Sequence, residues 1–174
     1  TAVEDEMVIQ TEIDSIRSLR RMILSKILAT HPHACLTCDM REGCSRIDCP
    51  HDVPLNERCC SLLGNCELQN VADYIGISPE TPKYHYNDLP KISDDPLIFR
   101  DFNLCISCGR CIRVCQGVKG VYALSAVVNS GKLAVGTVNG PSLEEAECTF
   151  CSSCVEVCPT GAIIDKNNTN QHDK

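Results

Sequence analysis

The alternation of apolar and polar residues predicts a long helix near the start of the chain. From residue 11 to residue 28 an apolar stripe recurs with helical spacing, and it consists of Ile13, Ile16, Ile23, Leu24, Ile27 and Leu28. Thr11 and, three residues later, Asp14 resemble a capping box at its start. His31-Pro32 is expected to end the helix, because a residue before proline disfavours helical geometry.

Shorter patterns predict the later elements. Apolar residues at i, i+3, i+4 and i+7 predict a second helix that Gly76 ends, and they are Leu68, Val71, Ala72 and Ile75. Residues 77–96 contain four prolines and little periodicity, which favours an extended connector. Ala123–Val128 and Leu133–Val138 favour a β-hairpin around Asn129-Ser130-Gly131.

Composition narrows the function classes. The net charge of −7 argues against a nucleic-acid partner, which would need a basic surface. No apolar run approaches the ~20 residues that a membrane span requires. Aromatic residues make up 4% of the chain, so a conventional core would be thin and metal–ligand bonds are expected to supply much of the folding free energy.

Fifteen cysteines in 174 residues carry the candidate chemistry. Their count is odd, no apolar signal segment is visible, and their spacings match metal-binding loops, so we expect metal-bound thiolates in place of disulfides. A reducing cytoplasm is the natural location for such thiolates.

Two groups of cysteines read Cys-x2-Cys-x2-Cys-x3-Cys, the spacing of bacterial [4Fe–4S] ferredoxins. The first group is Cys105, Cys108, Cys111 and Cys115, and the second is Cys148, Cys151, Cys154 and Cys158. Three thiolates of a run can wrap one cluster, and the fourth is expected to complete the other. One cluster therefore takes Cys105, Cys108, Cys111 and Cys158, and the other takes Cys148, Cys151, Cys154 and Cys115. Zinc on paired Cys-x2-Cys motifs is the alternative.

These motifs and elements predict an α+β fold. An N-terminal helix and a metal segment rich in histidine and cysteine join a ferredoxin-like module with two [4Fe–4S] clusters. We expect residues 1–76 to form the N-terminal part, 77–96 a linker, 97–165 the ferredoxin-type domain and 166–174 a polar tail. Cys115 is followed by Gln116-Gly117, whereas small bacterial ferredoxins place proline there, which favours a module embedded in an assembly.

The segment upstream carries His31-Pro-His-Ala-Cys35-x2-Cys38 and, later, Gly-Asn-Cys66-Glu-Leu-Gln. It resembles the segment after the [2Fe–2S] domain in the large iron–sulfur subunit of complex I. Related segments occur in NAD-linked formate dehydrogenases and [FeFe]-hydrogenases, and the resemblance covers about residues 11–165. It implies a [4Fe–4S] cluster bound by one histidine and three cysteines, with His31, Cys35, Cys38 and Cys66 as ligands.

Two ligand alternatives stay open. Cys44 keeps the family's x5 spacing from Cys38, whereas Cys66 keeps the Glu-Leu-Gln context and the helix that follows. His33 competes with His31, which has the family's x3 spacing to Cys35.

An insert between Cys38 and Cys66 departs from the family. It carries four more cysteines, namely Cys44, Cys49, Cys59 and Cys60. We expect them to bind one structural Zn²⁺, since four thiolates form a closed tetrahedral site. Free buried thiols and a fourth cluster are the alternatives.

No nucleotide-binding fingerprint or catalytic constellation is found, so the chain is expected to be a stand-alone, non-catalytic electron-transfer subunit of an oxidoreductase complex. It resembles the small iron–sulfur subunit of class II, ATP-independent benzoyl-CoA reductase. That resemblance implies three [4Fe–4S] clusters that pass low-potential electrons to a tungsten-pterin catalytic subunit, which reduces benzoyl-CoA to a cyclic diene in anaerobic aromatic degradation.

Other partners and roles fit the same motifs. Further subunits are expected to supply the electrons. The alternatives are the same role in a molybdenum or tungsten formate dehydrogenase or a hydrogenase, and a structural module held together by zinc.

Overall fold

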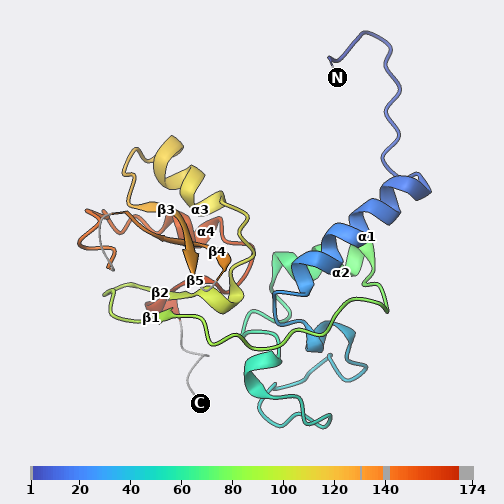
Figure 1. The fold of residues 1–174 in the computed structure, drawn as a ribbon, viewed down its shortest axis with the longest axis horizontal. Helices are drawn as coiled ribbons and strands as arrows, with labels where there is room; N and C mark the ends of the chain where they lie inside the picture. The colour runs from blue at the N-terminus through green and yellow to red at the C-terminus, as the bar shows by residue number, and fades with distance from the viewer. Residues whose placement is uncertain (1, 130, 139–141, 169–174) are drawn as a thin grey trace.

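The computed structural model describes residues 2–129, 131–138 and 142–168. An N-terminal part carries α1 (Asp14–Leu28) and α2 (Glu67–Ile75), and it lies beside a C-terminal part that carries the strands (Figure 1). Between α1 and α2 the chain is mostly irregular. It contains two short 3₁₀ turns, at Ala34–Thr37 and Leu55–Glu57. No helix among these described residues is long and apolar enough to span a membrane.

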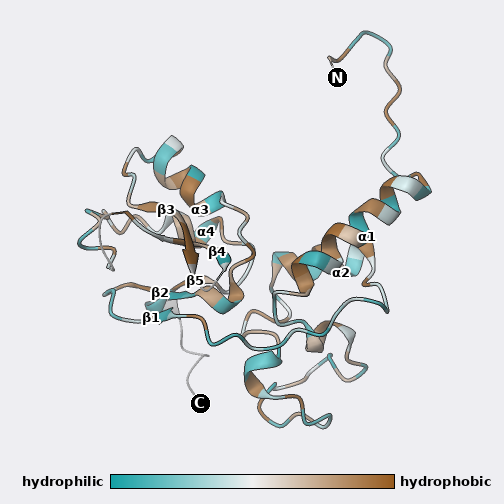
Figure 2. Ribbon diagram, in the orientation of Figure 1, coloured by the Kyte–Doolittle hydropathy of each residue, from teal (hydrophilic) through white to brown (hydrophobic). Residues whose placement is uncertain are grey.

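Helix α1 begins later than the sequence pattern predicts. Ile13 is its N-cap, no side chain caps it, and so the expected capping box at Thr11 does not form. Only the last turns of the apolar stripe are covered: Leu24 and Leu28 are buried against α2, whereas Ile13 and Ile23 are exposed. Figure 2 shows the hydrophobic residues that α1 carries.

The second helix that the sequence predicts is confirmed as α2, which ends at Gly76 as expected. Leu68 and Ala72 are its buried residues. Gly76 closes the helix with φ of +80°, and its amide donates to the carbonyl of Ala72 at 2.9 Å. Only glycine adopts this backbone conformation without strain, which explains why the helix ends there.

The C-terminal part contains two small antiparallel sheets. One has the order β1-β2-β5, and the other is the hairpin of β3 and β4. The strands are β1 (Lys91–Ile92), β2 (Ile98–Asp101), β3 (Leu124–Asn129), β4 (Lys132–Thr137) and β5 (Ile163–Asp165). The hairpin is confirmed within one residue, with Val128 opposite Leu133, although Ser130 of its turn lies outside the described residues. Strand β1 falls inside the segment expected to be a connector.

Each cysteine run contains a short helix that carries one or more of its later cysteines. These helices are α3 (Arg110–Arg113), which continues into a π-helical turn at Val114–Val118, and α4 (Ser153–Glu156). Two of the core residues between them and the sheets are cysteines, Cys111 and Cys115, which pack with Ile98, Leu124 and Leu143. The candidate ligands are therefore part of the core of this domain.

A buried ion pair lies at the edge of that core. Arg100 on β2 donates to the carboxylate of Asp95 at 2.9 Å, and their side chains are 2% and 0% exposed. Asp95 also accepts the amide of Leu143 at 2.6 Å. One carboxylate therefore holds together β2 and the segment that precedes the second cysteine run.

Candidate metal centres

The two cysteine loops share one backbone geometry. In each loop the residues on both sides of the middle cysteine have positive φ: Ser107 and Gly109 around Cys108, and Phe150 and Ser152 around Cys151. The amide of Ser107 donates to Sγ of Cys105 at 3.4 Å, and that of Phe150 donates to Sγ of Cys148 at 3.4 Å. Such amides stabilise a thiolate and turn successive cysteines toward a common centre.

The eight cysteines of these loops line two separate cavities. The first cavity is lined by Cys105, Cys108, Cys111 and Cys158, and the second cavity by Cys115, Cys148, Cys151 and Cys154. Each cavity is about 20 Å³ in volume. The last cysteine of each run thus lies with the first three of the other run, which is the grouping expected from the spacing.

Burial favours the protonated form of four of these eight thiols. It raises the pKa of Cys111 and of Cys154 to about 12, and raises that of Cys105 and Cys148 as well. The backbone amide of Ser153 instead lowers the pKa of Cys151, whose side chain is exposed. Metal binding at these cavities must therefore release protons, as expected where thiolates are the ligands.

His31 has the environment of a metal ligand. Its side chain is 4% exposed, and burial lowers its pKa to about 4, so the ring is neutral. Nδ1–H donates to the carbonyl of Pro32 at 2.8 Å, which leaves the lone pair on Nε2. Nε2 is buried and has no hydrogen-bond partner among the described residues, so its lone pair is available to bind a metal. In His33, Nδ1 bonds the carbonyl of His31 at 3.0 Å.

The eight candidate ligands of the N-terminal part lie around two further cavities. The histidine cavity, of about 10 Å³, is lined by His31, Cys59, Cys60 and Cys66. The insert cavity, of about 470 Å³, is lined by Cys35, Cys38, Cys44 and Cys49. This grouping differs from the one expected from the sequence, which joins Cys35 and Cys38 to His31 and joins Cys59 and Cys60 to Cys44 and Cys49.

The path of the insert explains the difference. It folds back so that Sγ of Cys59 faces the carbonyl of Pro32 at 3.7 Å, next to His31. Sγ of Cys60 lies against Gly161, where even a Cβ atom would approach it to 2.8 Å. The two cavities share a wall, because the amide of Cys59 donates to Sγ of Cys35 at 3.4 Å. Contact with Cys59 lowers the pKa of Cys35 to about 6.

A smaller group lies at the rim of the insert cavity. Ligand atoms of Cys38, Asp39 and His51 lie within 4.8 Å of one another. His51 pairs with Asp39 at 3.0 Å, and both side chains are half or more exposed. An exposed ion pair of this kind is common on protein surfaces and contributes little to stability.

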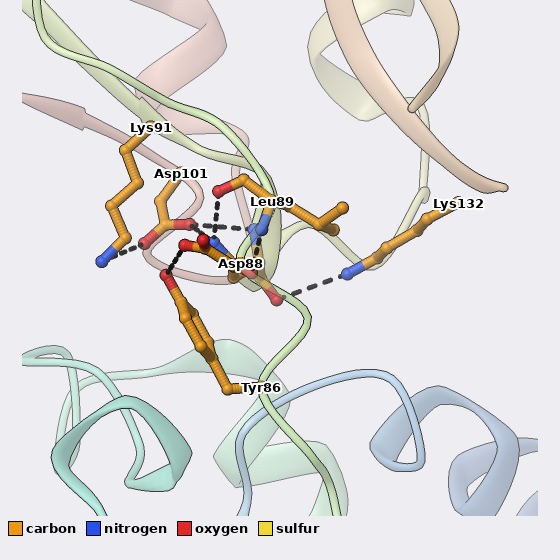
Figure 3. A network of polar contacts seen from close by, with 7 residues as sticks. Tyr86, Asp88, Leu89, Lys91, Asp101 and Lys132 are labelled. Carbon is orange, nitrogen blue, oxygen red and sulfur yellow. Dashed lines mark hydrogen bonds and ion pairs between the residues drawn. The ribbon is translucent and has the colours of Figure 1, made fainter. Parts of the chain in front are cut away.

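Lys132 connects the two parts of the chain close to these cavities. From β4 its ammonium donates to the carbonyls of Thr30, Phe102 and Asn103, at 3.1, 3.2 and 3.3 Å. Thr30 precedes His31, and Asn103 lies two residues before Cys105. Figure 3 shows Lys132 reaching a polar network that includes Leu89 and Asp101. No sequence pattern marks this lysine, since its partners are remote in the chain.

Replacing Lys132 with methionine should weaken the junction between the two parts. Methionine retains the apolar stem but removes the donor to three carbonyls, and hydrogen bonds to a charged group contribute about 1.5–3 kcal/mol. We expect denaturant unfolding to shift to lower concentration by about that free energy. The matched control is Lys119→Met, at an exposed position. Equal effects of the two variants would contradict the role of Lys132.

A ferredoxin-like α+β domain whose cysteines line two separate cavities defines an iron–sulfur protein. Residues 95–164 match the family of the NADH-quinone oxidoreductase subunit 3, ferredoxin-like domain. That part of the chain is therefore a ferredoxin-like domain of this kind.

Relatives of the whole chain are subunits of redox complexes. The chain is 32% identical to an NADP-reducing hydrogenase subunit HndD of Solidesulfovibrio fructosivorans, over 95% of this chain and 24% of the relative. It is 31% identical to the alpha subunit of an NADPH-Fe(3+) oxidoreductase of Geobacter sulfurreducens, over 95% of this chain and 17% of the relative. It is 27% identical to a putative formate dehydrogenase of Staphylococcus haemolyticus, over 96% of this chain and 15% of the relative. The chain thus spans a quarter or less of the length of these relatives.

The fold also matches a solved structure. An NAD⁺-reducing [NiFe]-hydrogenase in the H2-reduced state aligns with a TM-score of 0.61 and 22% identity, over 90% of this chain and 58% of that chain. The similarity extends beyond the ferredoxin-like domain, because it covers most of the N-terminal part as well.

Proposed function

We propose that the chain transfers electrons through three [4Fe–4S] clusters within an oxidoreductase complex. Two clusters are assigned to the first and second cavities, with the four cysteines of each as ligands. The third is assigned to His31 and Cys66 with two further cysteines. The observation that carries the proposal is the grouping of four cysteines around each cavity of the ferredoxin-like domain. A bound cluster supplies a one-electron couple at each site.

The chain's own residues provide a short covalent and hydrogen-bonded link between two of these sites. Sγ of Cys66 faces the carbonyl of Pro159 at 3.5 Å, and Pro159 directly follows Cys158 of the first cavity. The amide of Leu68 bonds the same carbonyl at 3.2 Å. Glu67 and Arg110 then fix α2 against α3 with two contacts of 2.7 Å. The two sites are thereby held in one relative position.

The opposite end of the domain is suited to exchange electrons with a partner. Cys151 of the second cavity is exposed, whereas Cys111 and Cys115 are buried. Partly buried apolar residues, Val121, Phe150 and Val155, pack against the core that contains Cys115, and Val121 also lines the second cavity. This arrangement supports an order in which electrons pass from the His31 site through the first cavity to the second, or in reverse.

For the partner we propose a tungsten-pterin catalytic subunit that reduces benzoyl-CoA to a cyclic diene, which rests on the sequence resemblance. The second candidate is a hydrogenase or a molybdenum or tungsten formate dehydrogenase, and the names of the hydrogenase and formate dehydrogenase relatives favour it. In either case this chain carries electrons and another subunit carries the chemistry.

Metal analysis of the native complex tests this function. We expect a complex captured anaerobically through this chain to be brown, to contain iron and acid-labile sulfide, and to give EPR signals of reduced [4Fe–4S] clusters. Tungsten together with benzoyl-CoA-dependent oxidation of the clusters would support the first partner, and molybdenum or nickel would favour the second. A colourless complex with zinc and without iron would overturn the electron-transfer proposal.

A further inference from the structure

The side-chain amine of Lys132 carries a positive charge between two of the proposed cluster sites. It donates to the carbonyls of Thr30, Phe102 and Asn103 at 3.1, 3.2 and 3.3 Å. A neutral amine has too few N–H groups to serve three acceptors at once, whereas an ammonium has one for each. The three carbonyl partners therefore require the protonated form of Lys132.

This charge is close to a candidate ligand on each side. Thr30 directly precedes His31, and Asn103 lies two residues before Cys105. Two residues of extended chain span at most about 7 Å, so the ammonium lies within about 10 Å of the backbone of both ligands. Burial raises the pKa of Cys105, and the charge of Lys132 opposes that rise. Burial, with a smaller contribution from the same charge, lowers the pKa of His31 to about 4.

The ammonium has carbonyl partners in place of a carboxylate. Among the residues that the structure describes, Lys132 forms no ion pair. Burial lowers its pKa, while Cys105 and Asp101 oppose that fall from a longer distance. Asp101 is itself shared with Lys91, whose ammonium lies at 3.8 Å (Figure 3). A half-buried cation of this kind is costly unless an anion lies nearby, and thiolate-bound clusters at the two flanking sites would be such anions.

The second cavity has a different charge environment. The backbone amide of Ser153 lowers the pKa of Cys151, and Lys119 makes only a minor contribution. Lys119 and Cys151 are both exposed, so water screens that charge. Burial raises the pKa of Cys148, and the carboxylate of Asp95 contributes in the same direction. Neither charge resembles the half-buried ammonium between the other two sites.

We propose that Lys132 is the shared counter-charge of the first-cavity cluster and the His31 cluster, and that it raises the reduction potential of both. This inference rests on the proposed function, because it requires clusters at these sites. Reduction adds an electron to a centre that its thiolates already make anionic, so a fixed cation nearby stabilises the reduced form more than the oxidised form. An electron that passes between the two sites stays close to the same cation. Lys132 therefore favours entry of an electron into this pair of sites without opposing its movement between them.

Redox titration of the full chain tests this role. The protein is reconstituted anaerobically with iron and sulfide, and each cluster is followed by its EPR signal. Lys132→Gln keeps N–H donors but removes the charge, so the first-cavity and His31 clusters should have more negative midpoint potentials. We expect the ratio of reduced to oxidised cluster at a given potential to fall about tenfold, which is about 59 mV for a one-electron couple. The second-cavity cluster should shift much less.

Two further variants separate the effect of charge from that of structure. Lys132→Arg keeps the charge and should keep the wild-type potentials. Lys119→Gln removes an exposed charge and should leave the first-cavity and His31 clusters at their wild-type potentials. A purely structural role of Lys132 predicts lower stability in Lys132→Gln without a change of potential. Unchanged potentials in Lys132→Gln, or an equal shift in Lys132→Arg, would overturn the role of the charge while leaving the proposed function intact.

The arginine variant also decides the case in which Lys132→Gln does not bind the two neighbouring clusters. Clusters retained in Lys132→Arg would show that the charge is what the sites require, whereas their loss in both variants would overturn the inference. The wild-type chain separates this result from a failure of the proposed function. If it binds no iron, the proposed function itself is wrong.

Discussion

Replacing Asp95 with alanine is expected to lower the free energy of unfolding by about 3–5 kcal/mol, because removing one partner of a buried ion pair is strongly destabilising. Asp95 is fully buried and pairs with Arg100, whose side chain is 2% exposed. The substitution also deprives the amide of Leu143 of its acceptor. Since natural domains are stable by only about 5–15 kcal/mol, the loss is a large part of the total.

The neighbouring residue provides a matched control. Asp94 has the same side chain and the same formal charge but is exposed. Asp94→Ala should change the free energy of unfolding by no more than about 0.5 kcal/mol. Both variants are unfolded with denaturant under anaerobic conditions and followed by circular dichroism. If Asp95→Ala unfolds at the same denaturant concentration as Asp94→Ala, the ion pair does not have the structural role that its burial indicates.

The sequence patterns predicted the secondary structure well where an element depends on residues that are close together in the chain. The second helix and the hairpin were expected within a residue or two, because their patterns depend on neighbours in sequence. The start of α1 was missed: Thr11 resembles a cap, but the chain before Asp14 is extended and Ile13 occupies the N-cap. Asp95 and Lys132 could not be found in this way, since Leu143 and Thr30 lie 48 and 102 residues from them.

The same distinction applies to the candidate metal sites. The spacing within each ferredoxin run already restricts its thiolates to a small region, and the two cavities contain the expected groups. In the insert, by contrast, Cys49 and Cys59 are separated by an irregular segment whose path no periodicity specifies. The insert reaches Gly161 through Cys60, a contact that joins residues about a hundred positions apart.

That contact places Cys60 of the insert against the segment that follows Cys158. Gly161 presents a surface without a side chain, so Cys60 can approach the segment that follows Cys158. Thr160, next to Gly161, donates to the carbonyl of Leu104 at 2.9 Å and so ties this segment to the first cysteine run. The insert, the His31 site and the first cavity thus meet at Pro159–Gly161. A change at this segment is expected to affect all three.

Removing Cys158 should eliminate the cluster of the first cavity and spare that of the second. Cys158→Ala and Cys111→Ala take a ligand from the same cavity, so each should lose about four iron atoms and the same EPR signal. Cys115→Ala and Cys154→Ala should lose the other signal, because both line the second cavity. Val118→Ala, an exposed position that follows the first run, should keep both clusters.

The four variants together test the crossed arrangement and not merely the presence of clusters. If each run bound its own cluster, Cys115→Ala would resemble Cys111→Ala, and Cys158→Ala would resemble Cys154→Ala. The crossed arrangement predicts the opposite pairing. It also has a mechanical consequence: α3 and its π-helical turn carry one ligand of each cavity, Cys111 and Cys115. One short helical segment then fixes both clusters, so their separation cannot change without unwinding it.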